Sequence, residues 1–249
     1  MLAADRRDAM RIAHAKAVAF AIAALDDGGM TTDPHERRGR DFVARHGETV
    51  FNAARRLQGD APHTPLTRAG FAQAEEMGRA LRDFLGPRPK LTMYASATGR
   101  ALQTLAIIAE HLELDWHQAR TDARLVEIGM GTWSGRYYDD LAREAADFMD
   151  PAYNLYRRPP PGGEWYDAIA ARVGAWASDT DNDPGDRLVI MHGMSSRVLR
   201  GVLTGADVVP QFDAPVAPDL PQGSIAMIEG GRETIAHLGS GGPSMAAPA

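Results

Sequence analysis

The chain has 249 residues, of which 44% are hydrophobic and 24% are charged, and it carries a formal net charge of −6 at pH 7. This composition is that of a globular protein, and the acidic balance argues against a nucleic-acid or membrane-surface partner, because no excess of cations exists to bind phosphate backbones. The sequence contains no cysteine, which excludes disulfides, cysteine nucleophiles and thiolate metal centres, and we expect a cytoplasmic protein.

Residues 1–40 are predicted to be an extension that precedes the folded domain. Its apolar stretch AVAFAIAAL (17–25) is shorter than the ~20 residues that cross a bilayer. Asp5 and Asp8 dilute the basic residues ahead of this stretch and no clear cleavage site follows, which argues against a secretory signal. Two interpretations stay open, an alanine-rich helix or sequence upstream of a start at Met30.

Short apolar segments alternate with amphipathic ones from Asp41 onward. Strands are expected at 42–44, 91–96, 124–129 and 187–193. The first two are each followed by a helix, one capped by Thr67 and stopped by Gly86-Pro87, the other opened by Ser96 or Thr98. Further helices are expected at 138–148, 166–176 and 198–205.

The C-terminal part of the domain differs from this alternation. A proline-rich loop (210–223) leads to two short apolar segments, 224–228 and 233–238, which flank Gly230-Gly231 and predict an antiparallel pair. Residues 240–249 are rich in glycine, proline and small residues and are predicted to be a disordered tail. We therefore expect an α/β fold, a three-layer αβα sandwich over residues 41–239 with a mostly parallel sheet and an antiparallel C-terminal strand pair.

Polar residues follow the predicted strands at the points where the strands end. In open α/β sheets ligands bind beyond these carboxyl ends. Two arginines, two histidines and one carboxylate would converge there, namely Arg45, His46, Arg100, Glu127 and His192.

This set of side chains suits a phosphoryl group. Guanidinium groups bind phosphate oxygens bidentately and stay charged, while neutral imidazole is a good nucleophile at phosphorus. Nearby arginines should hold the histidine neutral in the empty site, because they disfavour a second positive charge. A carboxyl group beside the anion is a suitable proton donor for the leaving alkoxide.

Five segments in order resemble the histidine phosphatase superfamily, the phosphoglycerate-mutase-like proteins. Arg45-His46-Gly47-Glu48-Thr49 with Asn52 is similar to the family signature R-H-G-[ET]-x-x-N. The resemblance continues through RLQGDAPHTPLTRAG (56–70), YASATGRALQT (94–104), LVEIGMGTWSG (125–135), and PPPGGE (159–164) with MHGMSSR (191–197). It covers roughly residues 42–200.

The resemblance implies a role for each matched residue. His46 would be the residue that is transiently phosphorylated, and Glu127 would donate the proton and then activate water. Arg45, Arg100 and His192 would hold the phosphoryl oxygens, helped by Asn52 and by the neighbouring Gln58, Gly59 and Gly193. No metal and no organic cofactor is implied.

The chain departs from the mutases at three places, and the first two departures favour a phosphatase. Mutases carry E-R-H-Y-G where this chain has Glu127-Ile128-Gly129-Met130-Gly131, a small hydroxyl where Gln58 stands, and an asparagine at Met194. The residues that hold the second acidic group of a phosphoglycerate are therefore missing, although Arg157 and Arg158 could still recognise such a group. The expected enzyme is a cofactor-independent, histidine acid-type phosphatase, a hydrolase of small soluble phosphomonoesters.

Two other functions remain as alternatives, a phosphoglycerate-type mutase and a non-catalytic module that binds phosphate. The aspartate-rich stretch DTDND (179–183) supports neither a calcium loop nor an aspartate nucleophile. No apolar strand precedes it, and proline stands where a calcium loop needs glycine.

Overall fold

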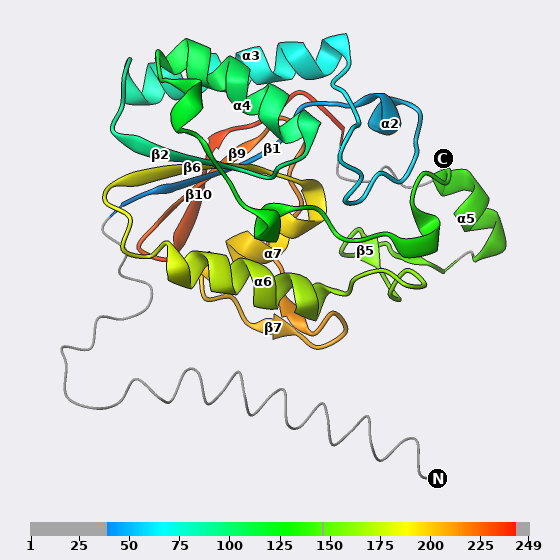
Figure 1. Ribbon diagram of the computed structural model, residues 1–249. Helices are drawn as coiled ribbons and strands as arrows, with labels where there is room; N and C mark the ends of the chain where they lie inside the picture. Colours follow the sequence, from blue (N-terminus) through cyan, green and yellow to red (C-terminus); the bar gives the residue numbers. More distant parts are fainter. Residues whose placement is uncertain (1–38, 146, 243–249) are drawn as a thin grey trace, which may run out of the picture. The chain divides into compact units, whose positions relative to one another are not determined.

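The computed structural model describes residues 39–145 and 147–242 (Figure 1). A six-stranded sheet forms its centre, in the order β10-β9-β1-β6-β2-β3. β1 (Asp41–Arg45), β6 (Asp186–Met191), β2 (Leu91–Ala95) and β3 (Arg120–Thr121) are parallel, whereas β9 (Ile225–Glu229) and β10 (Arg232–His237) form the antiparallel pair. The predicted mixed sheet is therefore confirmed.

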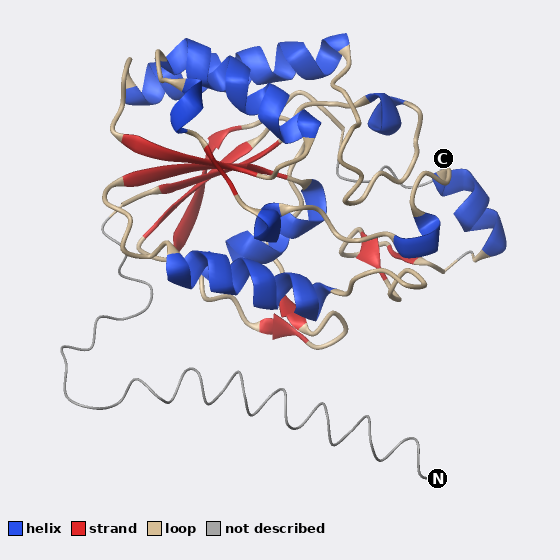
Figure 2. Cartoon of the chain, viewed as in Figure 1, coloured by secondary structure: helices blue, strands red, loops and turns tan. Residues whose placement is uncertain are grey.

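Helices cover both faces of this sheet, as Figures 1 and 2 show. α3 (Arg68–Leu85) and α4 (Gly99–Leu112) lie on one face, and α6 (Tyr166–Asp179) and α7 (Gly193–Leu203) lie on the other. Thr67 caps α3 through its side chain, which accepts a hydrogen bond from Gly70, and Gly86 ends the helix, as predicted. The three-layer αβα sandwich is thus the observed fold.

Strand side chains alternate between the two layers. Phe42 and Ala44 belong to the core under α3 and α4, whereas Val43 belongs to the core under α6 and α7. Such period-two alternation is what a sheet buried on both faces requires. The alternation places both faces of β1 out of water and leaves its carboxyl end as the place where polar groups emerge.

The segment 124–129 is not the strand that its apolar residues predict. It begins as a short 3-10 turn (Ala123–Leu125) that Asp122 caps, with the Asp122 carboxylate accepting from the Arg124 amide at 2.8 Å, and then continues irregularly. Leu125 and Ile128 still reach the core, three residues apart, so burial is satisfied without strand pairing. The edge strand is β3 instead, two residues long.

The remaining elements are short. The predicted helix 138–148 ends at Glu144, and the predicted helix 198–205 begins earlier, directly after β6. The elements not yet named are α2 (Val50–Ala53), η1 (Trp116–Gln118), η3 (Gly131–Trp133), α5 (Tyr138–Glu144), and the antiparallel pairs β4 (Met149–Asp150) with β5 (Leu155–Tyr156) and β7 (Val208–Val209) with β8 (Ala214–Pro215).

Of the predicted N-terminal extension (1–40), residues 1–38 lie outside the described residues, as do residues 243–249 of the predicted tail. Across the described ranges, no helix combines the length and the apolar character needed to cross a membrane. Residues 240–242 are described, and two of them hydrogen-bond to Gln222.

Candidate active site

The ends of β1 and β6 bring two histidines together. These strands are parallel neighbours in which Arg45 pairs with Met191, and the His46 amide donates to the Met191 carbonyl at 3.0 Å. The residue after each strand is a buried histidine, and the ring centroids of His46 and His192 lie 5.1 Å apart. The predicted convergence at this edge of the sheet is therefore present.

Arg100 bridges the two histidines from the first turn of α4. Its Nε lies 3.1 Å from His46 Nε2 and 3.2 Å from His192 Nδ1. Its terminal nitrogens donate to the carbonyl oxygens of Ala61 at 2.6 Å and Gly59 at 2.6 Å. The side chain is 0% exposed. Its hydrogen-bond acceptors are neutral oxygen and nitrogen atoms.

The site is electropositive in its empty state. Burial lowers the pKa of Arg100 to about 10, so the group stays charged at pH 7. Burial first, and then the charges of Arg100 and Arg45, hold the pKa of His46 well below its ordinary value. The pKa of His192 is lowered by burial and by Arg100. Both imidazoles are therefore neutral at physiological pH, as expected for histidines beside positively charged arginines.

Hydrogen bonding fixes the tautomer of His46. The Gly47 carbonyl oxygen lies 2.7 Å from His46 Nδ1 and can only accept, so Nδ1 carries the proton. The lone pair is then on Nε2, which is the atom that faces Arg100 and the site. This lone pair accepts a hydrogen bond from Arg100 Nε in the empty site. A neutral imidazole nitrogen whose lone pair points into an arginine-lined pocket is a nucleophile for phosphorus.

Gly47 is a glycine because the chain after β1 passes against the start of α3. A Cβ atom at this position would lie 2.3 Å from the Gly70 carbonyl oxygen, which is closer than real Cβ atoms come. The Gly47 amide donates to the Thr104 hydroxyl of α4 at 3.1 Å. Glycine therefore lets the loop after His46 pack directly on the helix layer.

Glu127 is held by the N-terminus of α7. Its two carboxylate oxygens accept from the backbone amides of Met194 at 3.0 Å and Ser195 at 2.9 Å, and the Ile128 amide adds a third hydrogen bond at 3.0 Å. These backbone amides hold the carboxyl group in one orientation at the helix N-terminus. The same helix start that follows His192 thereby positions the candidate acid.

One pocket gathers most of the predicted site residues. It is lined by the predicted residues Arg45, His46, Asn52, Gln58, Gly59, Glu127 and Gly193. Arg100 and His192 adjoin the pocket through their contact with His46. In the described part of the chain, no group of three or more histidine or acidic side chains could hold a metal ion.

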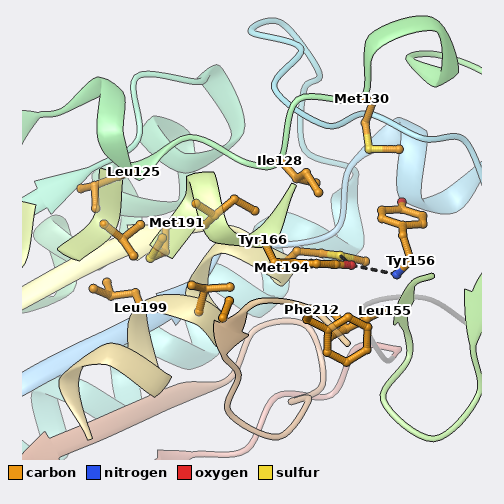
Figure 3. Close-up of a cluster of buried hydrophobic side chains, with 14 of the residues drawn as sticks. Leu125, Ile128, Met130, Leu155, Tyr156, Tyr166, Met191, Met194, Leu199 and Phe212 are labelled. Atoms are coloured by element: carbon orange, nitrogen blue, oxygen red, sulfur yellow. Dashed lines mark hydrogen bonds between the residues drawn. The ribbon is translucent and has the colours of Figure 1, made fainter. Parts of the chain in front are cut away.

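Sequence reasoning missed the other wall of this pocket. The same cavity is lined by Arg56, Ile128, Met130, Tyr138, Tyr156 and Met194. Four of these side chains belong to the larger hydrophobic core, in which the Tyr166 hydroxyl accepts from the Tyr156 amide at 2.8 Å (Figure 3). Arg56 lies in the segment 56–70 that resembles the family, so the sequence could have indicated it as a site residue. The apolar residues could not be recognised in this way, because in a sequence they look like ordinary core residues.

Arg56 is fixed at this wall by aromatic rings and a carbonyl. Its guanidinium carbon lies 4.6 Å from the Phe51 ring centroid and 5.2 Å from that of Tyr137, and its Nε donates to the Gly135 carbonyl at 2.7 Å. Arg157 and Arg158, by contrast, are exposed and do not line the pocket, and Arg157 lies 3.6 Å from Asp150.

The sequence pattern of the histidine phosphatase superfamily, branch 1, matches residues 42–239. The chain belongs to this superfamily. This membership agrees with the arginine–histidine cluster, with the mixed sheet and with the order of the matched segments.

Relatives of this superfamily member carry different activities in their names. The chain is 34% identical to the "Probable phosphoglycerate mutase GpmB" of Salmonella paratyphi C (strain RKS4594), over 66% of this chain and 74% of the relative. Its fold is also that of the alpha-ribazole phosphatase from Shigella flexneri, with a TM-score of 0.62, 23% identity and coverage of 84% and 100% of the two chains. A mycobacterial glucosyl-3-phosphoglycerate phosphatase in complex with VO3 superposes with a TM-score of 0.63 at 21% identity, over 82% of this chain and 99% of that chain.

Proposed function

We propose that this member of the superfamily is a cytoplasmic, cofactor-independent phosphatase that hydrolyses small soluble phosphomonoesters through a phosphohistidine on His46. The observation that carries the proposal is the buried Arg100, which binds two neutral imidazoles and backbone carbonyls and so leaves its charge available to an anion. A phosphomonoester is close to a dianion at neutral pH and matches that charge.

In the first half-reaction the Nε2 lone pair of His46 attacks phosphorus. The bond between phosphorus and the leaving oxygen breaks, and this oxygen takes the proton of the Glu127 carboxyl group. Arg45, Arg100 and His192 stabilise the equatorial oxygens as their charge develops. The products are a free alcohol, a phosphorylated His46 and a Glu127 carboxylate. The hydrogen bond from Nδ1 to the Gly47 carbonyl supports the positive charge of the phosphorylated ring.

In the second half-reaction Glu127 acts as a base. Its carboxylate takes a proton from water, and the water oxygen attacks the phosphorus of phospho-His46. The bond between nitrogen and phosphorus breaks and returns its electron pair to Nε2. Inorganic phosphate leaves, with His46 neutral and Glu127 protonated again, so protons and electrons balance over the cycle.

The pocket wall beside this site favours a phosphatase over a mutase. A phosphoglycerate carries a second acidic group, which needs cations of its own. Beyond the phosphoryl-binding residues, the described lining of the pocket offers one cation, Arg56, among Ile128, Met130, Tyr138, Tyr156 and Met194. An uncharged leaving alcohol fits such a wall better than a phosphoglycerate does.

The mutase alternative rests on the relatives named phosphoglycerate mutase. Incubation with 3-phosphoglycerate separates the two functions. The phosphatase releases inorganic phosphate, measured by a molybdate assay, or leaves the compound unchanged. Formation of 2-phosphoglycerate, measured by phosphorus NMR, would instead identify a mutase.

Trapping of the phosphorylated protein distinguishes both enzymes from a non-catalytic module. We expect a rapid quench in alkaline detergent during turnover of ³²P-labelled ester to leave a base-stable, acid-labile label on the protein, as a phosphoramidate requires. The label should map to the peptide that contains His46. Turnover should also persist in EDTA. Saturable vanadate binding without turnover of any ester in a phosphomonoester panel would reject the enzyme.

A further inference from the structure

The side-chain amide of Asn52 has a fixed orientation. The Thr49 backbone amide donates to Asn52 Oδ1 at 3.1 Å, as half of the capping box that starts α2. A backbone N–H can only donate, so the atom that faces Thr49 must be the oxygen. The Nδ2 end of Asn52 is therefore the other end, in a residue that lines the pocket together with Arg45 and His46.

A second donor reaches the same oxygen from a distant part of the chain. Gln222, at the end of the proline-rich loop, donates from Nε2 to Asn52 Oδ1 at 2.9 Å. Gln222 is buried, with 4% of its surface exposed. Thr49 and Gln222 together occupy the two lone pairs of this oxygen. A weaker contact from Gln58 Nε2, at 3.4 Å, adds to them.

The same arrangement sets the amide of Gln58. The Thr49 hydroxyl accepts from the Asn52 backbone amide at 3.1 Å and lies 2.9 Å from both Asn52 Oδ1 and Gln58 Oε1. Since Asn52 Oδ1 is already occupied by two N–H groups, the hydroxyl proton is directed to Gln58 Oε1. The NH₂ ends of Asn52 and Gln58 are thus the ends left for the pocket, where oxygen atoms of a phosphomonoester need donors.

Gln222 is itself held in place by the C-terminal segment. Its backbone amide donates to the Gly242 carbonyl at 2.9 Å, and its carbonyl accepts from the Gly241 amide at 3.1 Å. A Cβ at Gly241 would lie 2.6 Å from the Gln222 Cβ, so glycine permits this close crossing. The backbone of Gln222 is therefore fixed at a place from which its side chain reaches Asn52.

We propose that Gln222 is a positioning residue that fixes the amide of Asn52 with its NH₂ group toward the phosphoryl oxygens. This inference rests on the proposed function, because it assumes a phosphomonoester in the pocket. Without Gln222, Asn52 Oδ1 loses one of its donors and the amide can turn part of the time. An oxygen then faces the phosphate and repels it.

The test compares Gln222→Met, which keeps the volume but removes the donor, with Gln222→Glu, which places a carboxylate beside Asn52 Oδ1. Kinetic constants are measured with p-nitrophenyl phosphate, and the inhibition constant is measured with orthovanadate. We expect Gln222→Met to lower kcat/KM about tenfold and Gln222→Glu about a hundredfold, with weaker vanadate inhibition in both. The matched control is Gln211→Met, at the exposed glutamine of the same loop, which should leave both constants unchanged.

A double substitution separates positioning from a general effect on the fold. In Asn52→Asp both terminal atoms are oxygens, so no orientation is left to set. Gln222→Met should then change kcat/KM less than twofold in the Asn52→Asp background. A full tenfold loss in that background would overturn the inference, as would wild-type kinetics of both Gln222 variants.

Thermal unfolding of each variant shows that the protein measured is folded. If Gln222→Met does not fold, the isosteric Gln222→Glu supplies the same comparison. His46→Ala distinguishes the two proposals. If His46→Ala keeps its turnover, the proposed function fails. If His46→Ala is inactive while the Gln222 variants behave like wild type, only the present inference fails.

Discussion

Two buried arginines at opposite ends of the sheet have opposite surroundings. Arg187 lies near the amino end of β6 and is 1% exposed. It donates to both oxygens of Asp41, at 2.6 and 2.9 Å, and stacks on Trp176 with 4.8 Å from its guanidinium carbon to the ring centroid. Arg100, at the carboxyl ends of the strands, is equally buried but binds carbonyl oxygens, the Thr64 hydroxyl and two imidazoles.

The difference separates a structural arginine from one that awaits a ligand. A buried charge with its own carboxylate is compensated within the fold, and removing either partner is costly. Arg100 is held in place by neutral acceptors, and among the described residues no carboxylate is hydrogen-bonded to it, although the charges of Glu127 and Asp60 act on it from further away. Its position is therefore fixed without a direct ionic partner. The fold thus preorganises the site and leaves its electrostatic partner to the substrate.

The largest expected effect comes from the nucleophile that this charge serves. His46→Ala should lower kcat by a factor of 10³–10⁶, about 4–8 kcal/mol of activation free energy, because it removes the nitrogen that forms the bond to phosphorus. The measurement is steady-state turnover of p-nitrophenyl phosphate. His117→Ala, at an exposed histidine, is the matched control and should behave as wild type. A near-normal rate in His46→Ala would contradict the mechanism.

At the opposite end of the sheet the expected loss is one of stability. Arg187→Met leaves Asp41 buried without this partner and should lower the free energy of unfolding by about 3–5 kcal/mol, measured by urea denaturation. The kcat of the folded variant should stay at the wild-type value, because Arg187 lies far along β6 from His192. Adding Asp41→Leu should recover most of the stability. A large fall in kcat would show that the two ends are coupled.

Arg100→Lys tests the site end of the comparison with a charge-conserving change. Lysine keeps the positive charge but cannot reach the carbonyls of Gly59 and Ala61 and both histidines at once. We expect kcat/KM to fall by about 10²–10³, or roughly 3–4 kcal/mol, with a weaker affinity for vanadate. The matched control is Arg187→Lys, in which stability should fall and kcat should not. Equal kinetics of Arg100→Lys and wild type would assign Arg100 to the fold alone.

The sequence revealed the site better than its surroundings, for a physical reason. Arg45, His46, Arg100 and His192 emerge beside strand ends or a helix start, and parallel strands bring such positions to one edge. Glu127 lies in the same pocket as His46 although the predicted strand 124–129 is irregular. Its carboxylate is positioned by backbone amides at the start of α7. The position of this side chain therefore does not depend on whether segment 124–129 is a strand.

The leaving-group wall and the Gln222 contact could not be found in this way. Tyr156 and Met130 lie in the hydrophobic core as well as the pocket, and a single sequence does not distinguish the two surroundings. Gln222 reaches Asn52 across 170 residues of chain, from a loop without a motif. Contacts of this kind follow from tertiary packing, so only the three-dimensional arrangement displays them.

The smallest effect in this series is the dependence of stability on pH, and it also distinguishes the two ends of the sheet. Burial holds the pKa of His46 and of His192 well below 6.5 in the folded protein, whereas in the unfolded chain each protonates near 6.5. Below pH 6.5 the unfolded state therefore binds more protons, so the free energy of unfolding falls as the pH falls. For the two histidines together the loss between pH 6.5 and pH 5.5 should be about 2 kcal/mol.

Urea denaturation at pH 7.5, 6.5 and 5.5 measures this loss. The double variant His46→Asn/His192→Asn should lose the dependence of the free energy of unfolding on pH in this range. If the double variant keeps the wild-type slope, the acid sensitivity arises elsewhere, and the burial of two neutral histidines at the site end carries no such cost.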